Sequence, residues 1–162
     1  MHAPTALPTH HSTTLAHPQS ERPVLDLQRL ETIALWLEAG APEHGPVKRF
    51  DMAAGITAPS TSARATCNTA CCIAGAAVQF FEARWAARQP LEAGIMDWRA
   101  LAARARMALG LSEAQASVLF EPDFAHGGRM DRYSDPAWAA RTVRHLMATG
   151  VADWEAAAEA RT

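Results

Sequence analysis

The chain has 162 residues, which is enough for one hydrophobic core and too few for two of comfortable size. Hydrophobic residues make up 49% of the chain and charged residues 20%, and the formal net charge is −2. This near-neutral balance disfavours non-specific nucleic-acid binding, which requires a strongly cationic surface, although a local arginine patch could still contact phosphates. No apolar run approaches the roughly eighteen residues of a membrane span, and we find no secretory signal pattern, so we expect a cytoplasmic protein.

Residues 1–23 differ in composition from the rest of the chain. They are rich in His, Pro, Thr and Ser and show no apolar period. Such a segment buries too little apolar surface to offset the entropy lost on ordering. We therefore expect a disordered tail over 1–23 and one helical domain over 24–162.

The segments that follow carry apolar residues at helical spacing, between residues that typically start and end helices. Asp26, Ser112 and Asp135 are expected N-caps, Gln115 completes a capping box with Ser112, and Gly40 fits the left-handed position after the first helix. The predicted helices run, in chain order, from about 26 to 39, from 68 or 69 to 88, from 98 to 109, from Ser112 to Pro122, from Asp135 to Gly150 and from 153 to 160. No stretch alternates strictly enough to predict a strand, so the expected fold class is all-α, a compact single domain of five or six helices.

The helix expected over 68–88 opens with small residues, including Ala74, Gly75 and Ala76. A glycine inside a helix costs about 1 kcal/mol relative to alanine. Close approach of another backbone would offset that cost, so we expect this helix to be central. The long segments 41–66 and 121–134 are expected to be loops, and loops of this length are often functional.

Three cysteines, Cys67, Cys71 and Cys72, fall within six positions near the expected start of this helix. A helix N-terminus lowers the pKa of a thiol, so Cys67 or Cys71 could act as a nucleophile if His44, His126 or His145 served as base. Alternatively, the cysteines are small buried residues, as free cysteines commonly are. A third reading makes Cys67 and Cys71 zinc ligands on one helical face, although the sequence offers no second pair of ligands.

Several charged residues are candidates for binding a partner. Asp51, which lies between Phe50 and Met52, is expected to cap a short helix or to be a buried carboxylate. The last third of the chain concentrates arginines that could contact an acidic partner or simply be solvated, namely Arg129, Arg132, Arg141 and Arg144. The corner around Gly110 is compatible with a helix-turn-helix, but a plain capped corner between two helices is favoured.

The chain contains four short motifs in this order: "RFDM" at 49–52, "CNTACCIAG" at 67–75, "LGLSEAQASVLF" at 109–120 and "TG" at 149–150. In this combination the chain resembles, over about 25–150, a group of small proteins of bacteria, phages and other mobile elements. Asn68 stands where the group has glycine, Cys72 is an additional thiol, and 121–124 lacks the usual Trp-Pro. The resemblance implies a common fold and a mobile-element setting, and it transfers no catalytic residue.

No phosphate-binding loop, dinucleotide fingerprint or common hydrolase motif is present, so no cofactor is implied and an enzyme is disfavoured. We therefore expect a non-enzymatic binding module with a protein partner, such as a phage or mobile-element accessory protein that acts on a host protein or defence complex. A cysteine-dependent enzyme and a small zinc-binding domain remain as alternatives. Self-association is also compatible with the sequence, since an aromatic residue such as Trp154 could be either a dimer contact or part of the core.

Overall fold

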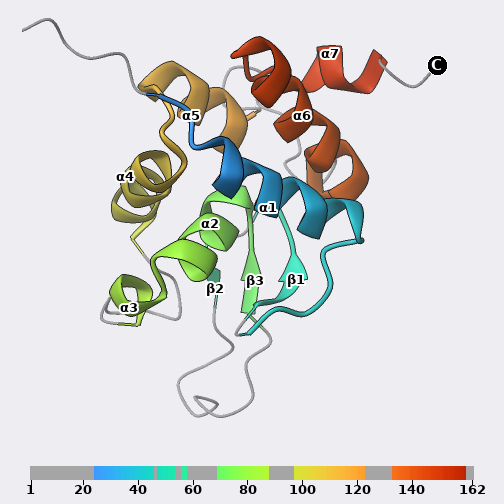
Figure 1. Cartoon of the computed structure of the whole chain (residues 1–162). Coiled ribbons are helices and arrows are strands. Elements are labelled where there is room, and N and C mark those ends of the chain that lie inside the picture. Colours follow the sequence, from blue (N-terminus) through green and yellow to red (C-terminus); the bar gives the residue numbers. More distant parts are fainter. Residues whose placement is uncertain are drawn as a thin grey trace, which may run out of the picture.

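The computed structural model of the protein describes residues 24–45, 47–53, 56–57, 69–87, 97–122 and 133–159. The tail expected over 1–23 lies outside these residues. The described residues form seven helices and one small sheet (Figure 1). A mostly helical fold was therefore predicted correctly, whereas the prediction that the chain contains no strand is wrong. None of the described helices is long and apolar enough to cross a membrane.

The described residues form seven helices rather than the five or six expected, because the helix predicted over 68–88 is interrupted at Glu82. The helices are α1 (Leu27–Glu38), α2 (Ile73–Phe81), α3 (Ala83–Ala86), α4 (Trp98–Leu109), α5 (Glu113–Phe120), α6 (Pro136–Thr149) and α7 (Trp154–Glu159). The predicted caps are confirmed, because Asp26 accepts a hydrogen bond from the backbone N–H of Arg29 at 3.0 Å and Asp135 caps α6. Ser112 and Gln115 form the reciprocal capping box at the start of α5.

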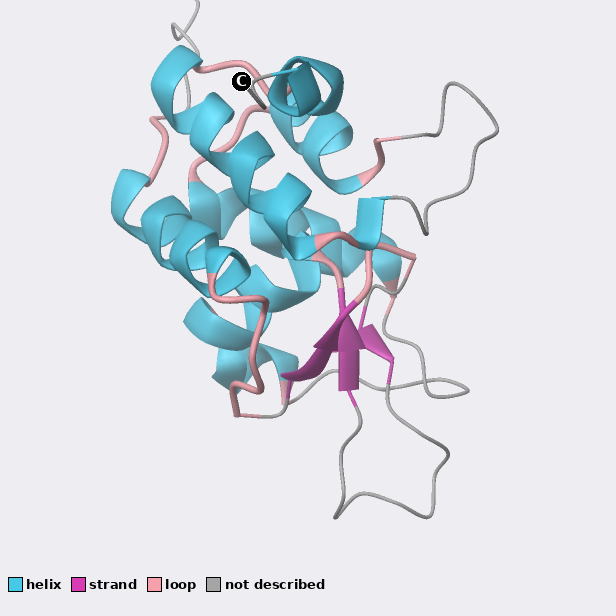
Figure 2. Ribbon diagram, turned by 90° about the vertical axis from the view of Figure 1, so that its right-hand side faces the viewer, coloured by secondary structure: helices cyan, strands magenta, loops and turns pink. Residues whose placement is uncertain are grey.

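The segment expected to begin the second helix forms a strand instead. β3 (Thr69–Cys71) lies between β1 (Val47–Phe50), to which it is parallel, and β2 (Ile56–Thr57), to which it is antiparallel (Figure 2). Pairing on both sides satisfies the backbone groups of β3, so α2 begins only at Ile73, after the N-cap Cys72. Strands of two to four residues are too short for alternation to reveal, which is why part of 41–66 was mistaken for a loop.

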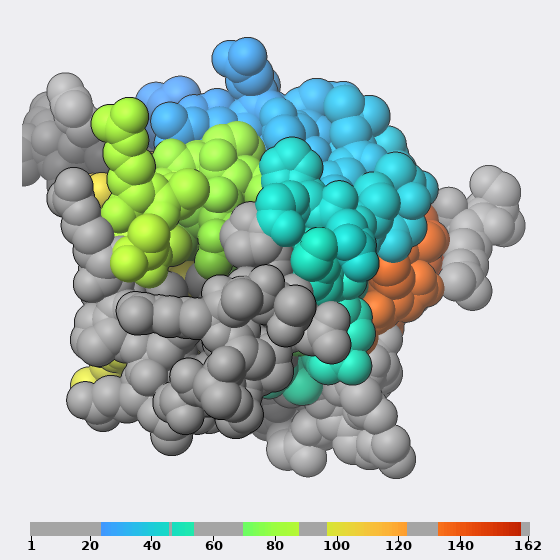
Figure 3. Space-filling model, turned by 90° about the horizontal axis from the view of Figure 1, so that it is seen from below, coloured from blue at the N-terminus to red at the C-terminus, as the bar shows by residue number. Residues whose placement is uncertain are grey.

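The β3–α2 segment runs through the middle of the core. Every residue of 70–78 is buried. The predicted central position of this helix is confirmed, since α2 packs mainly on α4 and also contacts α1, α5 and the strands β1 and β3. Seen from below, surface residues of α1, of the segment 69–87 and of the β1 region lie side by side (Figure 3).

α6 packs along α1 on one side and against α7 on the other. Three aromatic rings hold α7 against α6. Tyr133 stacks on Trp138 with ring centroids 5.0 Å apart, and both rings meet Trp154 edge to face. The indole N–H of Trp138 donates to the backbone carbonyl of Trp154 at 2.7 Å. The short helix α7 is thereby held in a defined place.

Gly110 marks a close approach of two segments at the end of α4. Its φ is +65°, and an added Cβ would lie 2.0 Å from the backbone carbonyl oxygen of Val24. The same crossing is held by a 3.0 Å hydrogen bond from the N–H of Asp26 to the carbonyl of Leu109. Backbone freedom and the absence of a side chain are both required here.

We expect Gly110→Ala to lower the free energy of unfolding by about 3 kcal/mol or more, because backbone strain and overpacking act together. Gly40→Ala is the matched control, since Gly40 also has a positive φ but has nothing within 4 Å of an added Cβ. Strain alone predicts a loss of about 1 kcal/mol there. Urea unfolding of both variants measures the difference, and equal losses would show that the Val24 contact is unimportant.

Candidate functional site

The two described cysteines lie inside the core. Cys71 ends β3 and Cys72 caps α2, and both are 0% exposed. Burial raises the pKa of the Cys71 thiol far above its ordinary value, and the neighbouring Cys72 adds to the effect. Burial likewise raises the pKa of Cys72 to about 11, although its Sγ accepts a hydrogen bond from the N–H of Gly75 at 3.5 Å. This direction is opposite to that of a thiol activated at a helix N-terminus.

The histidines considered as bases lie elsewhere. His145 is half-buried on α6, and the ring of His44 contacts Phe80 with centroids 4.3 Å apart. In the part of the chain that the structure describes, no hydrogen bond joins Cys71 or Cys72 to a histidine. The same residues contain no group of three His, Cys, Asp or Glu side chains that could hold a metal ion. Cys67 and His126 lie outside them.

We expect both buried thiols to alkylate slowly at neutral pH in the native protein and rapidly once the chain is unfolded. The Cys67→Ser variant leaves only Cys71 and Cys72 to react, and its melting temperature checks that it folds. Reactivity should rise only at strongly alkaline pH, because the pKa of Cys72 is about 11. A native thiol that titrates near or below the ordinary value of about 8.5 would contradict this assignment.

Asp51 joins the end of β1 to the turn before α6, rather than capping a helix. Its Oδ1 accepts from the N–H of Ala53 at 3.0 Å and from the Ser134 hydroxyl at 3.3 Å. Its Oδ2 lies 3.1 Å from a guanidinium nitrogen of Arg49. The "RFDM" motif thus has a structural explanation: Phe50 and Met52 are buried, while Arg49 and Asp51, which alternate with them, form an ion pair.

The two described arginine candidates on α6 hold helices together. The Arg144 guanidinium donates to Glu38 at 2.8 and 3.2 Å and also bonds Glu31, so it links α6 to α1. Bonding to Arg144 lowers the pKa of Glu38. Arg141 donates to the carbonyl of Ala157 at 3.1 Å, near the end of α7. Arg129 and Arg132 lie outside the described residues.

We expect Arg144→Met to lower the free energy of unfolding by about 1 kcal/mol at low salt, and by less at high salt, because the ion pairs are partly exposed and are screened. Arg99→Met is the control, since Arg99 is exposed on α4 and forms no ion pair with the rest of the described chain. Urea titrations at two salt concentrations provide the measurement. A loss that is the same at both concentrations would argue against the ion-pair explanation.

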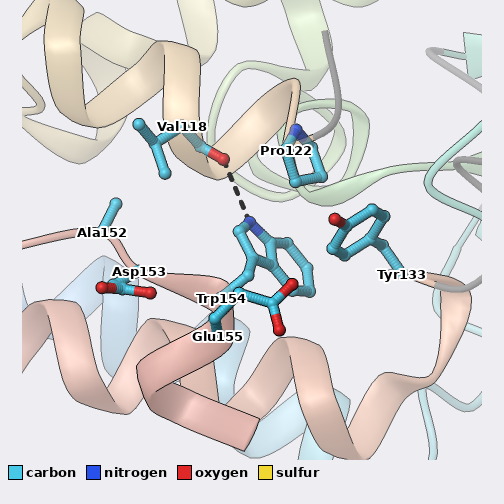
Figure 4. A pocket seen from close by; sticks show the side chains of 7 residues that line it. All are labelled: Val118, Pro122, Tyr133, Ala152, Asp153, Trp154 and Glu155. Atoms are coloured by element: carbon cyan, nitrogen blue, oxygen red, sulfur yellow. Dashed lines mark hydrogen bonds between the residues drawn. The ribbon is translucent and has the colours of Figure 1, made fainter. Parts of the chain in front are cut away.

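A pocket of about 360 Å³ lies between the end of α5 and the start of α7 (Figure 4). We call it the α5–α7 pocket, and it is lined by Val118, Pro122, Tyr133, Ala152, Asp153, Trp154 and Glu155. The indole N–H of Trp154 donates to the carbonyl of Val118 at 3.0 Å across it. Trp154 and Tyr133 are almost fully buried, so their rings form the floor of the pocket.

The rim of the pocket combines apolar and acidic groups. Val118 is 43% exposed, and Val151, which precedes the lining residue Ala152, is 55% exposed. Asp153 is half-exposed and Glu155 is exposed, and none of the described lining residues is basic. Sequence reasoning missed this pocket, because it forms only where segments distant in the chain meet.

No family model, curated protein or solved structure matches the chain. The function must therefore be argued from the described residues themselves.

Proposed function

We propose that the chain is a non-enzymatic binding module that contacts a protein partner through the α5–α7 pocket. The observation that carries the proposal is the exposed Val118 at the wall of a pocket with an aromatic floor, together with the exposed Val151, which directly precedes the lining residue Ala152. Fully burying an exposed valine contributes about 1.5–3 kcal/mol. A patch of this kind, placed around a concave site, is typical of a surface that a partner covers.

The floor of the pocket is held rigidly, which favours binding. The Trp154 ring contacts Tyr133 and Trp138, its indole N–H donates to the carbonyl of Val118, and its own carbonyl accepts from Trp138. A site that is already ordered loses little conformational entropy when a partner binds. The buried cysteines support the same proposal, because their raised pKa values favour the unreactive thiol form at neutral pH.

The biological setting that we propose is that of a phage or mobile-element accessory protein, whose partner is a host protein or defence complex. Support for this setting comes from the sequence motifs alone. The segments 41–66 and 121–134 could also contribute to the binding surface. Many of their residues lie outside the part of the chain that the structure describes.

We expect Val118→Asp to abolish capture of a stoichiometric partner from a bacterial lysate by the immobilised full-length chain. Leu35→Asp is the matched control, because Leu35 is a similarly exposed apolar residue on a different helix, with 53% of its surface accessible. A captured protein counts only if its binding saturates and survives Leu35→Asp. Capture that is equal with both variants, or absent with the unmodified chain, would refute the proposal.

A further inference from the structure

We infer that the outer face of α4 binds an acidic helical segment of a protein. This inference goes beyond the proposed function, because none of the described residues that line the α5–α7 pocket belongs to α4. It is carried by two arginines without a partner, by the apolar groups beside them and by their spacing along the helix.

The outer face of α4 is defined by helical spacing. α4 packs mainly on α2 and also contacts α1 and α5, through the buried residues Leu101, Ala105, Ala108 and Leu109. With about 3.6 residues per turn, Arg99, Ala103 and Arg106 follow one another along the other side, and Met107 lies beside Arg106. Arg106 is half-buried, whereas the other three are exposed. In Figure 1, α4 lies among the helices at the left-hand edge of the molecule.

The positive charge of this face has no counterpart within the described chain. α4 contains three arginines and no acidic residue. Arg104 pairs with Glu82 at 2.9 Å, whereas Arg99 and Arg106 form no ion pair with the described residues. Asp97, which precedes α4, is engaged as its cap, because its Oδ1 accepts from the N–H of Arg99 at 3.0 Å.

This lack of partners is unusual in the molecule. Apart from Arg84, every other described lysine or arginine bonds to a carboxylate or a carbonyl, namely Arg29, Lys48, Arg49, Arg104, Arg141 and Arg144. Two cations on one helix face, with no carboxylate bonded to either, are complemented by an anionic partner.

The apolar groups of the face favour a protein segment over a nucleic acid. Met107 is 66% exposed, and methionine adapts well to varied apolar surfaces. Ala103 has a small side chain, which allows another helix to approach closely. A phosphate backbone would engage the two guanidinium groups but would leave Met107 uncovered, and the formal net charge of −2 disfavours it further.

The spacing of the arginines sets the pattern of the segment. Arg99 and Arg106 are two helical turns apart, which is about 10.5 Å along the axis. A partner helix that lies along α4 presents carboxylates at the same interval when its acidic residues also recur every seven residues. An apolar side chain between them then meets Ala103. Carboxylate and guanidinium groups can pair through two parallel hydrogen bonds, which fixes this register.

The test measures binding of labelled, capped peptides to the full chain by fluorescence anisotropy. The acidic peptide consists of three repeats of Glu-Gln-Ala-Leu-Ala-Gln-Ala, and matched peptides carry Gln or Lys in place of every Glu. We expect the acidic peptide to bind saturably, and more weakly as the salt concentration rises. The Gln and Lys peptides should bind at least about tenfold more weakly.

Three outcomes of these titrations would overturn the inference. One is the absence of binding by the acidic peptide, and another is equal binding of the Gln peptide, which would show that apolar contact alone is responsible. The third is displacement of the acidic peptide by a lower concentration of an oligothymidylate strand, which would show that the face binds nucleic acid instead.

Arg99→Glu with Arg106→Glu is the decisive variant, because neither side chain is buried and the packed side of α4 is unchanged. Its affinity for the acidic peptide should fall at least about tenfold, and it should bind the Lys peptide instead. A purely structural role of the arginines would not produce this exchange of partners. Loss of the acidic peptide without gain of the Lys peptide would therefore refute the inference. The melting temperature checks folding, and Arg99→Gln with Arg106→Gln replaces the variant if it is unfolded.

Arg84→Glu is the matched control for a single reversal. Arg84 is an exposed arginine on α3 that forms no ion pair with the described residues. Arg99→Glu alone should weaken binding of the acidic peptide, whereas Arg84→Glu, which changes the net charge equally, should leave it unchanged. Equal losses would show that the overall charge, and not the outer face of α4, attracts the peptide.

The inference and the proposed function fail separately. If the acidic peptide does not bind while Val118→Asp still abolishes capture of a partner, only the inference is wrong. If no partner is captured but the acidic peptide binds and depends on Arg99 and Arg106, only the proposed function is wrong. Loss of the acidic peptide in Val118→Asp would place the peptide in the α5–α7 pocket and would also overturn the inference.

Discussion

The structure depends on the burial of one continuous segment, 70–78, which passes from a strand into a helix without reaching the surface. A buried backbone must satisfy its hydrogen bonds internally. β3 achieves this by pairing with β1 and β2 on its two sides, and α2 does so by helix formation after the cap at Cys72. Small residues, such as Ala74 and Gly75, then allow helices and strands to approach from several directions.

This constraint places the cysteines where their chemistry is suppressed. Cys71 and Cys72 sit at the junction of strand and helix, where burial disfavours the thiolate form. Groups that could meet a partner must therefore lie farther out. At the opposite side of α6, the rings of Tyr133, Trp138 and Trp154 position α7 and thereby form the floor of the α5–α7 pocket.

Local signals in the sequence predicted much of the fold. Caps such as Asp26 and Ser112, and the glycine after α4, act through hydrogen bonds and backbone conformation within a few residues, so a single sequence reveals them. The strands were missed because β1 and β3 are very short and their partners are some twenty residues apart, so no alternation marks them. The cysteine cluster was expected at a helix start for the same reason, whereas Cys71 lies on β3 and Cys72 caps α2.

The candidate site was less predictable than the fold, because its parts come together only in the folded chain. Arg144 looked like a binding residue, but Glu31 and Glu38, which it bonds, lie 113 and 106 residues away in the sequence. Trp154 is likewise placed by a distant residue, because its indole bonds to Val118, 36 residues away in the sequence. Its ring is buried and belongs to the core. Pairings over such distances leave no periodic pattern in the sequence.

The segment 70–78 is the structural core, and we propose that a partner binds on the outer helices. Hydrogen–deuterium exchange of the free full-length chain tests this arrangement most directly. Amides of 70–78 should exchange last, only when the whole chain unfolds, and those of α7 should exchange earlier. Exchange of 70–78 as early as that of α7 would contradict the claim and would make the cysteines accessible for chemistry.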